Sequence, residues 1–194
     1  MHRRLPRAER RTQLIGVATD KFGERGFFPT SMDDIAEAAG ITKPVLYQHF
    51  ASKEDLYIAV IENIGSQISQ NIEDLPTEAA NTRERIEAGI GMFFDLMSHQ
   101  SSTLRLFFGT EFITDNVQQQ VTDVVDKVAQ SIGHVVSHTR QLNEQEALVI
   151  GHSFAAAVQA SAKQAIDASA EERDLIRTTL VSLLADGLQA FRQD

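Results

Sequence analysis

Residues 30–50, with the sequence TSMDDIAEAAGITKPVLYQHF, contain two short helical patterns separated by a single glycine. Ser31 stands where its hydroxyl can cap the first helix, with an acidic residue three positions later. Gly40 can adopt the left-handed conformation that ends a helix without a Cβ clash. The second helix begins at Thr42, a good N-cap residue, and places Pro44 in its first turn, where a missing N–H costs nothing. This arrangement predicts a helix-turn-helix motif.

The second helix of the motif is expected to present a polar, aromatic and cationic face. At 100° per residue, Leu46 and Phe50 fall on one side and leave the other side free. That free side suits a major groove, because an amide can read a base edge, proline and valine can touch a thymine methyl, and lysine can reach guanine or phosphate. The candidate DNA-binding residues, including flanking positions that could hold phosphates, are Thr30, Ser31, Thr42, Lys43, Pro44, Val45, Tyr47, Gln48, His49 and Lys53. An ordinary helical hairpin with a solvated polar face is the alternative.

The residues that follow the turn narrow this choice. The run ITKPVLYQHFASKEDLY, residues 41–57, resembles the signature of the TetR family of bacterial repressors. In that signature a Leu-Tyr-x-His-Phe recognition helix precedes a Ser-Lys-Glu/Asp-x-Leu helix start. The matching residues here are Leu46, Tyr47, His49, Phe50, Ser52, Lys53, Glu54, Asp55 and Leu56. The resemblance covers about the first 60 residues, and spaced identities of this kind are more specific than a short motif.

The TetR resemblance implies a function for the whole chain. It implies a homodimeric transcriptional regulator, most simply a repressor, that binds a palindromic double-stranded DNA operator. A small-molecule effector that binds the C-terminal domain would then release the DNA. Because few candidate catalytic groups are present in the sequence, we also expect that the protein is not an enzyme and needs no cofactor.

A net charge of −9 is unusual for a DNA-binding protein, but the charge is distributed unevenly along the chain. Residues 1–55 hold 9 Lys and Arg against 8 Asp and Glu, whereas residues 56–194 hold 9 against 19. Five arginines fall within the first eleven residues and form either a disordered tail or an arm that contacts phosphates or the minor groove.

The composition also bounds where the protein works. Cysteine is absent, which excludes disulfides and thiolate metal sites. No apolar run reaches the roughly 18 residues of a membrane span, and the start of the sequence lacks the apolar segment of a secretory signal. We therefore expect a cytoplasmic protein with no membrane partner.

The pattern predicts an all-α fold of about nine helices. Residues 1–55 are expected to form a three-helix helix-turn-helix DNA-binding domain with a basic N-terminal arm. Residues 56–194 are expected to form a helical effector-binding and dimerisation domain, because they contain only one proline and repeated cap-x-x-acid signals. The helices are predicted near residues 9–25, 31–39, 42–50, 52–72, 82–98, 103–113, 115–138, 144–166 and 171–192.

Aromatic residues gather in the second domain and supply more apolar bulk than one helical face can hide. Core packing and the lining of an effector cavity both explain them. The candidate effector-binding residues are Phe93, Met97, Phe107, Phe108, Phe112 and Phe154. The net charge of −10 of residues 56–194 favours an apolar chain or a hydrophobic cation over a small anion. Of these two, an elongated lipid-like effector is preferred, because the acids of this domain fall mostly at caps and solvated faces.

The last two predicted helices differ in the size and polarity of their side chains. Residues 151–165 are rich in small side chains, and residues 175–191 carry a wide apolar stripe. Together they are typical of one half of a four-helix dimer interface, as in TetR-like proteins, although a monomeric bundle is the alternative. A charge at Ala157 or Leu184 would test which of these residues faces a partner.

Histidines provide the main competing chemistry. His134 and His138 are four residues apart on one helical face, a spacing that can bind metal, and His99 or His152 could add a ligand. A helical metal-binding module or enzyme is therefore one alternative, and a lipid carrier with a basic arm is another. The sequence contains no HExxH motif, P-loop, glycine-rich dinucleotide turn or GxSxG elbow.

Overall fold

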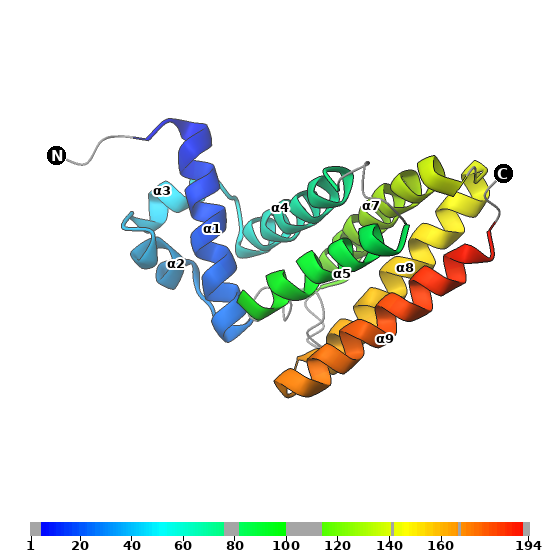
Figure 1. Ribbon diagram of the computed structural model, residues 1–194. Helices are drawn as coiled ribbons and strands as arrows, with labels where there is room; N and C mark the ends of the chain where they lie inside the picture. The colour runs from blue at the N-terminus through cyan, green and yellow to red at the C-terminus, as the bar shows by residue number, and fades with distance from the viewer. Residues whose placement is uncertain (1–4, 76–81, 100–113, 141, 167, 192–194) are drawn as a thin grey trace. The chain divides into compact units, whose positions relative to one another are not determined.

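Helices account for all the regular secondary structure in the computed structural model, which describes residues 5–75, 82–99, 114–140, 142–166 and 168–191. Within these residues there are eight helices and no strand (Figure 1). They are α1 (Arg7–Arg25), α2 (Met32–Ala38), α3 (Lys43–Tyr47), α4 (Lys53–Glu73), α5 (Thr82–His99), α7 (Asp115–Arg140), α8 (Glu144–Ala165) and α9 (Ala170–Gln189). The all-α class is confirmed. The helix predicted at 103–113 lies outside the described residues.

The chain divides into two compact units, with divisions after Ile64, Gln100 and Thr122. The first and third segments form one unit, and the second and fourth form the other. Helices α4 and α7 each contribute residues to both units. The functional boundary at residue 55 stays a prediction.

The first unit is built on one face of α1. Leu14, Ala18 and Phe22 are spaced four residues apart, so they lie above one another on one face of the helix. All three side chains are fully buried. The ring of Phe22 packs edge-on against Tyr57 of α4, with 5.1 Å between their centroids. Helix α2 contacts both α1 and α3. The helix-turn-helix pair is thus held on a scaffold of two longer helices.

The second unit is a helical bundle in which α9 packs against α5 and α8. Val136, Ile150 and Leu188 form a buried cluster that joins α7, α8 and α9. Glycines bring α7 and α8 close together: a Cβ on Gly133 would clash with the carbonyl oxygen of Ala147, and one on Gly151 with that of Ala129. The small residues of α8 therefore permit backbone contact between the two helices.

The helix ends follow the cap signals in the sequence. The boxes Asn143 with Glu146 and Ser169 with Glu172 are both formed, with each side chain bonded to the other residue's amide. Helix α4 is capped by Ser52, whose hydroxyl accepts a hydrogen bond from the Asp55 amide at 3.0 Å. None of the described helices is long and apolar enough to cross a membrane.

Candidate nucleic-acid interface

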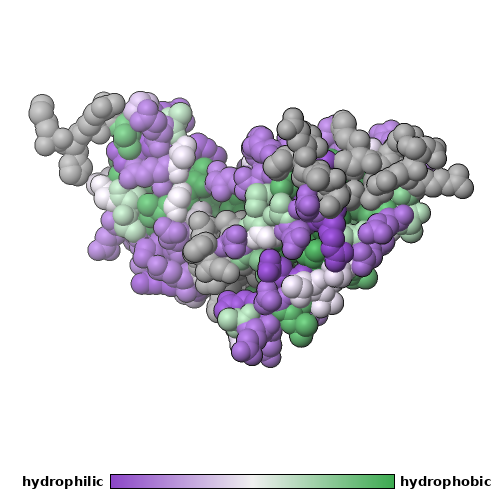
Figure 2. Space-filling view, viewed as in Figure 1, coloured by the Kyte–Doolittle hydropathy of each residue, from purple (hydrophilic) through white to green (hydrophobic). Residues whose placement is uncertain are grey.

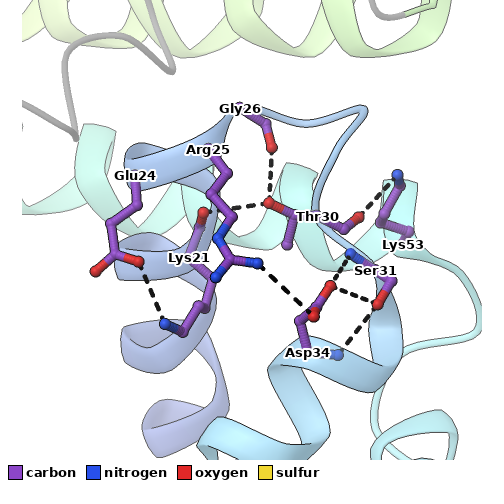
Figure 3. Close-up of polar contacts among 8 residues, drawn as sticks. All are labelled: Lys21, Glu24, Arg25, Gly26, Thr30, Ser31, Asp34 and Lys53. Carbon is purple, nitrogen blue, oxygen red and sulfur yellow. Dashed lines mark hydrogen bonds and ion pairs between the residues drawn. The ribbon is translucent and has the colours of Figure 1, made fainter.

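Helix α2 begins with the capping box that the sequence predicts. The Ser31 hydroxyl accepts a hydrogen bond from the Asp34 amide at 3.1 Å, and the Ser31 amide donates to Asp34 Oδ2 at 2.8 Å (Figure 3). The same hydroxyl donates to Asp34 Oδ2 at 2.6 Å. These bonds, first from the side chain and then from the backbone of Ser31, lower the pKa of Asp34. The start of α2 is therefore fixed without any ligand.

The turn between α2 and α3 has the expected glycine geometry. Gly40 has a φ of 66°, a left-handed conformation that disfavours residues with a Cβ. The Ile41 amide then donates to the Ala36 carbonyl at 3.0 Å, which closes the end of α2. The Gly40 amide also donates to the Glu37 carbonyl at 3.0 Å, and the two bonds together form a Schellman motif around the left-handed glycine that the sequence predicts.

Thr42 occupies the N-cap position of α3, as predicted, although its side chain makes no capping hydrogen bond. Two neighbours explain the missing bond. Pro44 at the second helical position has no N–H to donate. The next amide, that of Val45, donates to the backbone carbonyl of Thr42 at 2.9 Å instead. The Thr42 hydroxyl is exposed, and no bond of the cap holds it.

Helix α3 divides into an inner and an outer face as predicted. Leu46, within the helix, and Phe50, which follows it, are buried. The outer face consists of exposed side chains, with Val45 and His49 half-buried at its edges; its exposed members are Thr42, Lys43, Pro44, Tyr47 and Gln48. An exposed face on a short helix behind a tight turn is the geometry that reads a major groove.

Lys43, the first residue of this face, is held by α2. Its Nζ lies 2.7 Å from Asp33 Oδ2, in a pair whose side chains are 46% and 66% exposed. The hydrogen bond to Asp33, and then its charge, raise the pKa of Lys43. Asp33 is a residue that the sequence analysis missed as part of this surface. The acid-rich first turn of α2 was the available signal.

Thr30 and Lys53 have structural roles in the α1–α2 turn (Figure 3). Thr30 is buried, and its hydroxyl lies 2.8 Å from the Gly26 carbonyl and 3.2 Å from the Lys21 carbonyl. Lys53 Nζ donates to the carbonyls of Thr30, Phe27 and Phe28 at 3.0, 2.9 and 3.3 Å. An ammonium has three N–H donors, so these three bonds use all of them. Neither side chain is therefore placed to donate to a phosphate in this conformation.

The first turns of α1 place arginines beside the end of α3. Arg11 donates to the His49 carbonyl at 3.2 Å, and its guanidinium lies 4.3 Å from the centre of the Phe50 ring. Burial, followed by the charges of Arg7, Arg11 and Arg10, lowers the pKa of His49. The arginines of the predicted arm from Arg7 onward are thus helical, and they add positive charge next to the outer face of α3.

Comparisons with known proteins agree with this geometry. Residues 14–60 match the family model described as bacterial regulatory proteins, tetR family. The chain is 35% identical over 148 residues to the HTH-type transcriptional activator FasR of Mycolicibacterium smegmatis, a match that covers 76% of this chain and 68% of FasR. The chain belongs to the TetR family. It is therefore a DNA-binding transcriptional regulator of the helix-turn-helix type.

Two further relatives of this TetR-family chain are informative. It is 31% identical over 98 residues to the HTH-type transcriptional repressor KstR2 of Mycobacterium tuberculosis. That match covers 50% of this chain and 49% of KstR2. The fold also matches the crystal structure of FadR from Bacillus subtilis in complex with stearoyl-CoA. That match has a TM-score of 0.75 and 17% identity, and it covers 91% of this chain and 98% of FadR.

The structure describes only some of the candidate effector-binding residues of this TetR-family chain. Phe93 is half-buried, and its ring centre lies 6.1 Å from that of Phe94. Phe154 packs against the Val136 cluster, as the core interpretation expects. The side chain of Met97 lies outside the described residues, as do Phe107, Phe108 and Phe112. Their role as a cavity lining stays a prediction.

The histidines do not form a metal centre among the described residues, which contain no group of three potential His, Asp or Glu ligands. His152 lies 3.3 Å from Asp126 and 2.9 Å from the Leu148 carbonyl through its two ring nitrogens. His134 is exposed, whereas the side chains of His138 and His99 lie outside the described part of the chain.

Proposed function

We propose that this TetR-family regulator acts as a homodimeric repressor in the cytoplasm. Each subunit would insert α3 into one half-site of a palindromic operator. An apolar or lipid-like effector bound in the second unit would favour a conformation with lower DNA affinity. The observation that carries the DNA-binding part is the exposed outer face of α3, which combines Lys43, Tyr47 and Gln48 and follows a helix, α2, that is fixed by a capping box.

The α8–α9 surface supports the dimer. Leu175 and Leu183 on α9 are 66% and 65% exposed, and Leu148 and Val149 on α8 are also exposed. Hydrophobic residues are visible along the edge that α8 and α9 form in the space-filling view (Figure 2). Large exposed side chains of this kind, gathered on two adjacent helices, mark a surface that a second copy can cover.

The structure changes the choice of residue for testing this interface. Leu184 is only 7% exposed, because it faces the interior of its own subunit, so a charge there would damage the core. Ala157 is half-buried. Leu183, the next residue along α9, is the better probe.

Two observations bear on the effector and on the direction of regulation. The fold neighbour FadR is described with stearoyl-CoA, which supports an effector with a long apolar chain. FasR is named an activator and KstR2 a repressor. We infer repression as the simplest mode of regulation. In this mode the effector only has to prefer the conformer that does not fit DNA, and its binding then releases the operator.

The test combines operator selection with a release screen. DNA fragments retained by the wild-type protein should share a palindrome with half-sites about one helical turn apart or slightly more. Gln48→Ala should weaken binding to that palindrome by about 1–3 kcal/mol. Gln67→Ala, an exposed glutamine on α4, is the matched control and should leave binding unchanged. Unchanged operator affinity in Gln48→Ala and Lys43→Ala would show that α3 is not the reading helix.

Reporter expression in cells settles the direction of regulation. Deletion of the gene should raise transcription from a promoter that carries the selected palindrome. A fall in transcription would make the protein an activator.

A further inference from the structure

A buried arginine in α5 has no partner that the described chain supplies. Arg85 is only 8% exposed, and Thr30 is the one other polar or charged residue in the described chain that is buried to this degree. The hydroxyl of Thr30 is satisfied by backbone carbonyls, but Arg85 Nε has no hydrogen-bond acceptor. None of the ion pairs formed between described residues includes Arg85.

A second arginine of the same helix, Arg83, has hydrogen-bond partners for its guanidinium. Arg83 is exposed, donates to Asp186 at 3.0 Å and to Ser182 at 3.1 Å, and so ties α5 to α9. A guanidinium carries five N–H donors, and burying one without an anion is strongly unfavourable. Arg85 is largely buried and thus retains unused hydrogen-bond donors that could bind an oxyanion.

The helical face that carries Arg85 continues as an apolar track. Arg85, Gly89 and Phe93 recur every four residues, so they share one face and span about 12 Å. Gly89 contributes no side chain, and the nearest atom to a Cβ placed there would be Leu75 Cδ1 at 3.4 Å. Phe93 is half-buried at the far end. The face therefore offers a cation, then bare backbone beside a buried leucine, and then an aromatic ring.

The geometry points to Arg85 as the anion-binding residue of the effector site, and to an amphiphile with an oxyanion head and an apolar chain as its ligand. The guanidinium would hold a carboxylate or phosphate in a bidentate contact, and the chain would follow α5 toward Phe93. This inference rests on the proposed effector-responsive function and refines its ligand class. It adds an anionic head group to the apolar or lipid-like ligand that the sequence predicts.

The test measures binding to the full chain by calorimetry with four probes: dodecanoate, 1-dodecanol, dodecanoyl-CoA and CoA. The wild type should bind at least one of the two charged amphiphiles about tenfold or more tightly than 1-dodecanol. Preference for dodecanoate identifies a carboxylate as the head group, and preference for dodecanoyl-CoA identifies the phosphates. Arg85→Met should remove the preference, whereas Arg83→Met should retain it.

A stability measurement separates binding from a structural role. Because Arg85 is buried without a partner, Arg85→Met should unfold at the same temperature as the wild type or higher. Arg85→Lys keeps the charge and should keep part of the preference. A lower unfolding temperature of Arg85→Met, or an unchanged preference in that variant, would overturn the assignment.

The outcomes also separate this inference from the proposed function. If the wild type binds 1-dodecanol as tightly as the charged amphiphiles, the role of Arg85 fails and the apolar effector stands. If none of the probes binds while the operator is still bound, both this inference and the lipid-like effector fail, and DNA recognition stands.

Discussion

In the proposed complex with DNA, Asp33 would compete with the nucleic acid for Lys43, and Asp33→Asn should therefore tighten binding to DNA. The two side chains form a 2.7 Å ion pair, and both are well exposed, so the pair contributes only about 0.2–1 kcal/mol. A dimer on a palindrome has to release two such pairs, which gives about 0.4–2 kcal/mol. The expected gain in affinity is about 2-fold to 30-fold.

The gain should be larger on random DNA than on the operator. Phosphates attract Lys43 on any sequence, whereas base contacts that require its correct placement occur only on the operator. The measurement is an anisotropy titration of the operator and of a scrambled duplex of equal length at fixed salt. Asp33→Asn should lower the ratio of the two affinities.

A matched control and a double-mutant cycle isolate the ion pair from the general loss of a negative charge. Glu37→Gln removes the same charge from an exposed position one turn later in α2, and Glu37 makes no ion pair with a described residue. In a Lys43→Met background, Asp33→Asn should have no more effect than Glu37→Gln. Equal effects of Asp33→Asn and Glu37→Gln in the wild-type background would refute the reasoning.

Leu183→Glu should split the proposed dimer, because it places charges on the exposed face of α9. Sedimentation velocity that shows an intact dimer would move the interface elsewhere. Burial and neighbouring arginines hold the pKa of His49 below its usual range in the free protein, and a nearby phosphate would raise it. Binding to DNA would then take up protons, so operator affinity should rise as the pH falls from neutral into the acid range. His49→Asn should lack this pH dependence in the same titration. Ser31→Ala should lower the free energy of unfolding by about 0.5–2 kcal/mol, measured by urea denaturation, because it removes the α2 cap. Gly40→Ala should cost about 1–2 kcal/mol from backbone strain alone, since a Cβ there has no neighbour within 4 Å, and a neutral result would contradict the left-handed turn.

Local chemistry made much of this fold predictable. The capping box at Ser31, the left-handed Gly40 and the inward side of α3 depend on residues within a few positions of one another, so the sequence pattern contains them. Periodic apolar residues and cap signals likewise predicted the described helices to within a few residues at each end.

Contacts between distant residues were not predictable in the same way. Lys53 was expected at the DNA because it starts a helix, but carbonyls more than twenty residues earlier take all three of its donors. The choice between Leu183 and Leu184 depends on how α9 is rotated against α5 and α8, and a broad apolar stripe does not fix that rotation. Arg85 looked like one more charge of a helix, and only its burial makes it conspicuous.

The three bonds of Lys53 also make this position intolerant of a substitution that is usually regarded as conservative. The donors of an ammonium diverge as a tripod and match three carbonyls that converge on one point. The donors of an arginine lie in one plane and cannot meet three such acceptors together, and acetylation of the lysine would leave a single N–H. The ammonium group of Lys53 therefore holds the α1–α2 turn against the first turn of α4 through three diverging hydrogen bonds. A positive charge with another geometry would not replace this group.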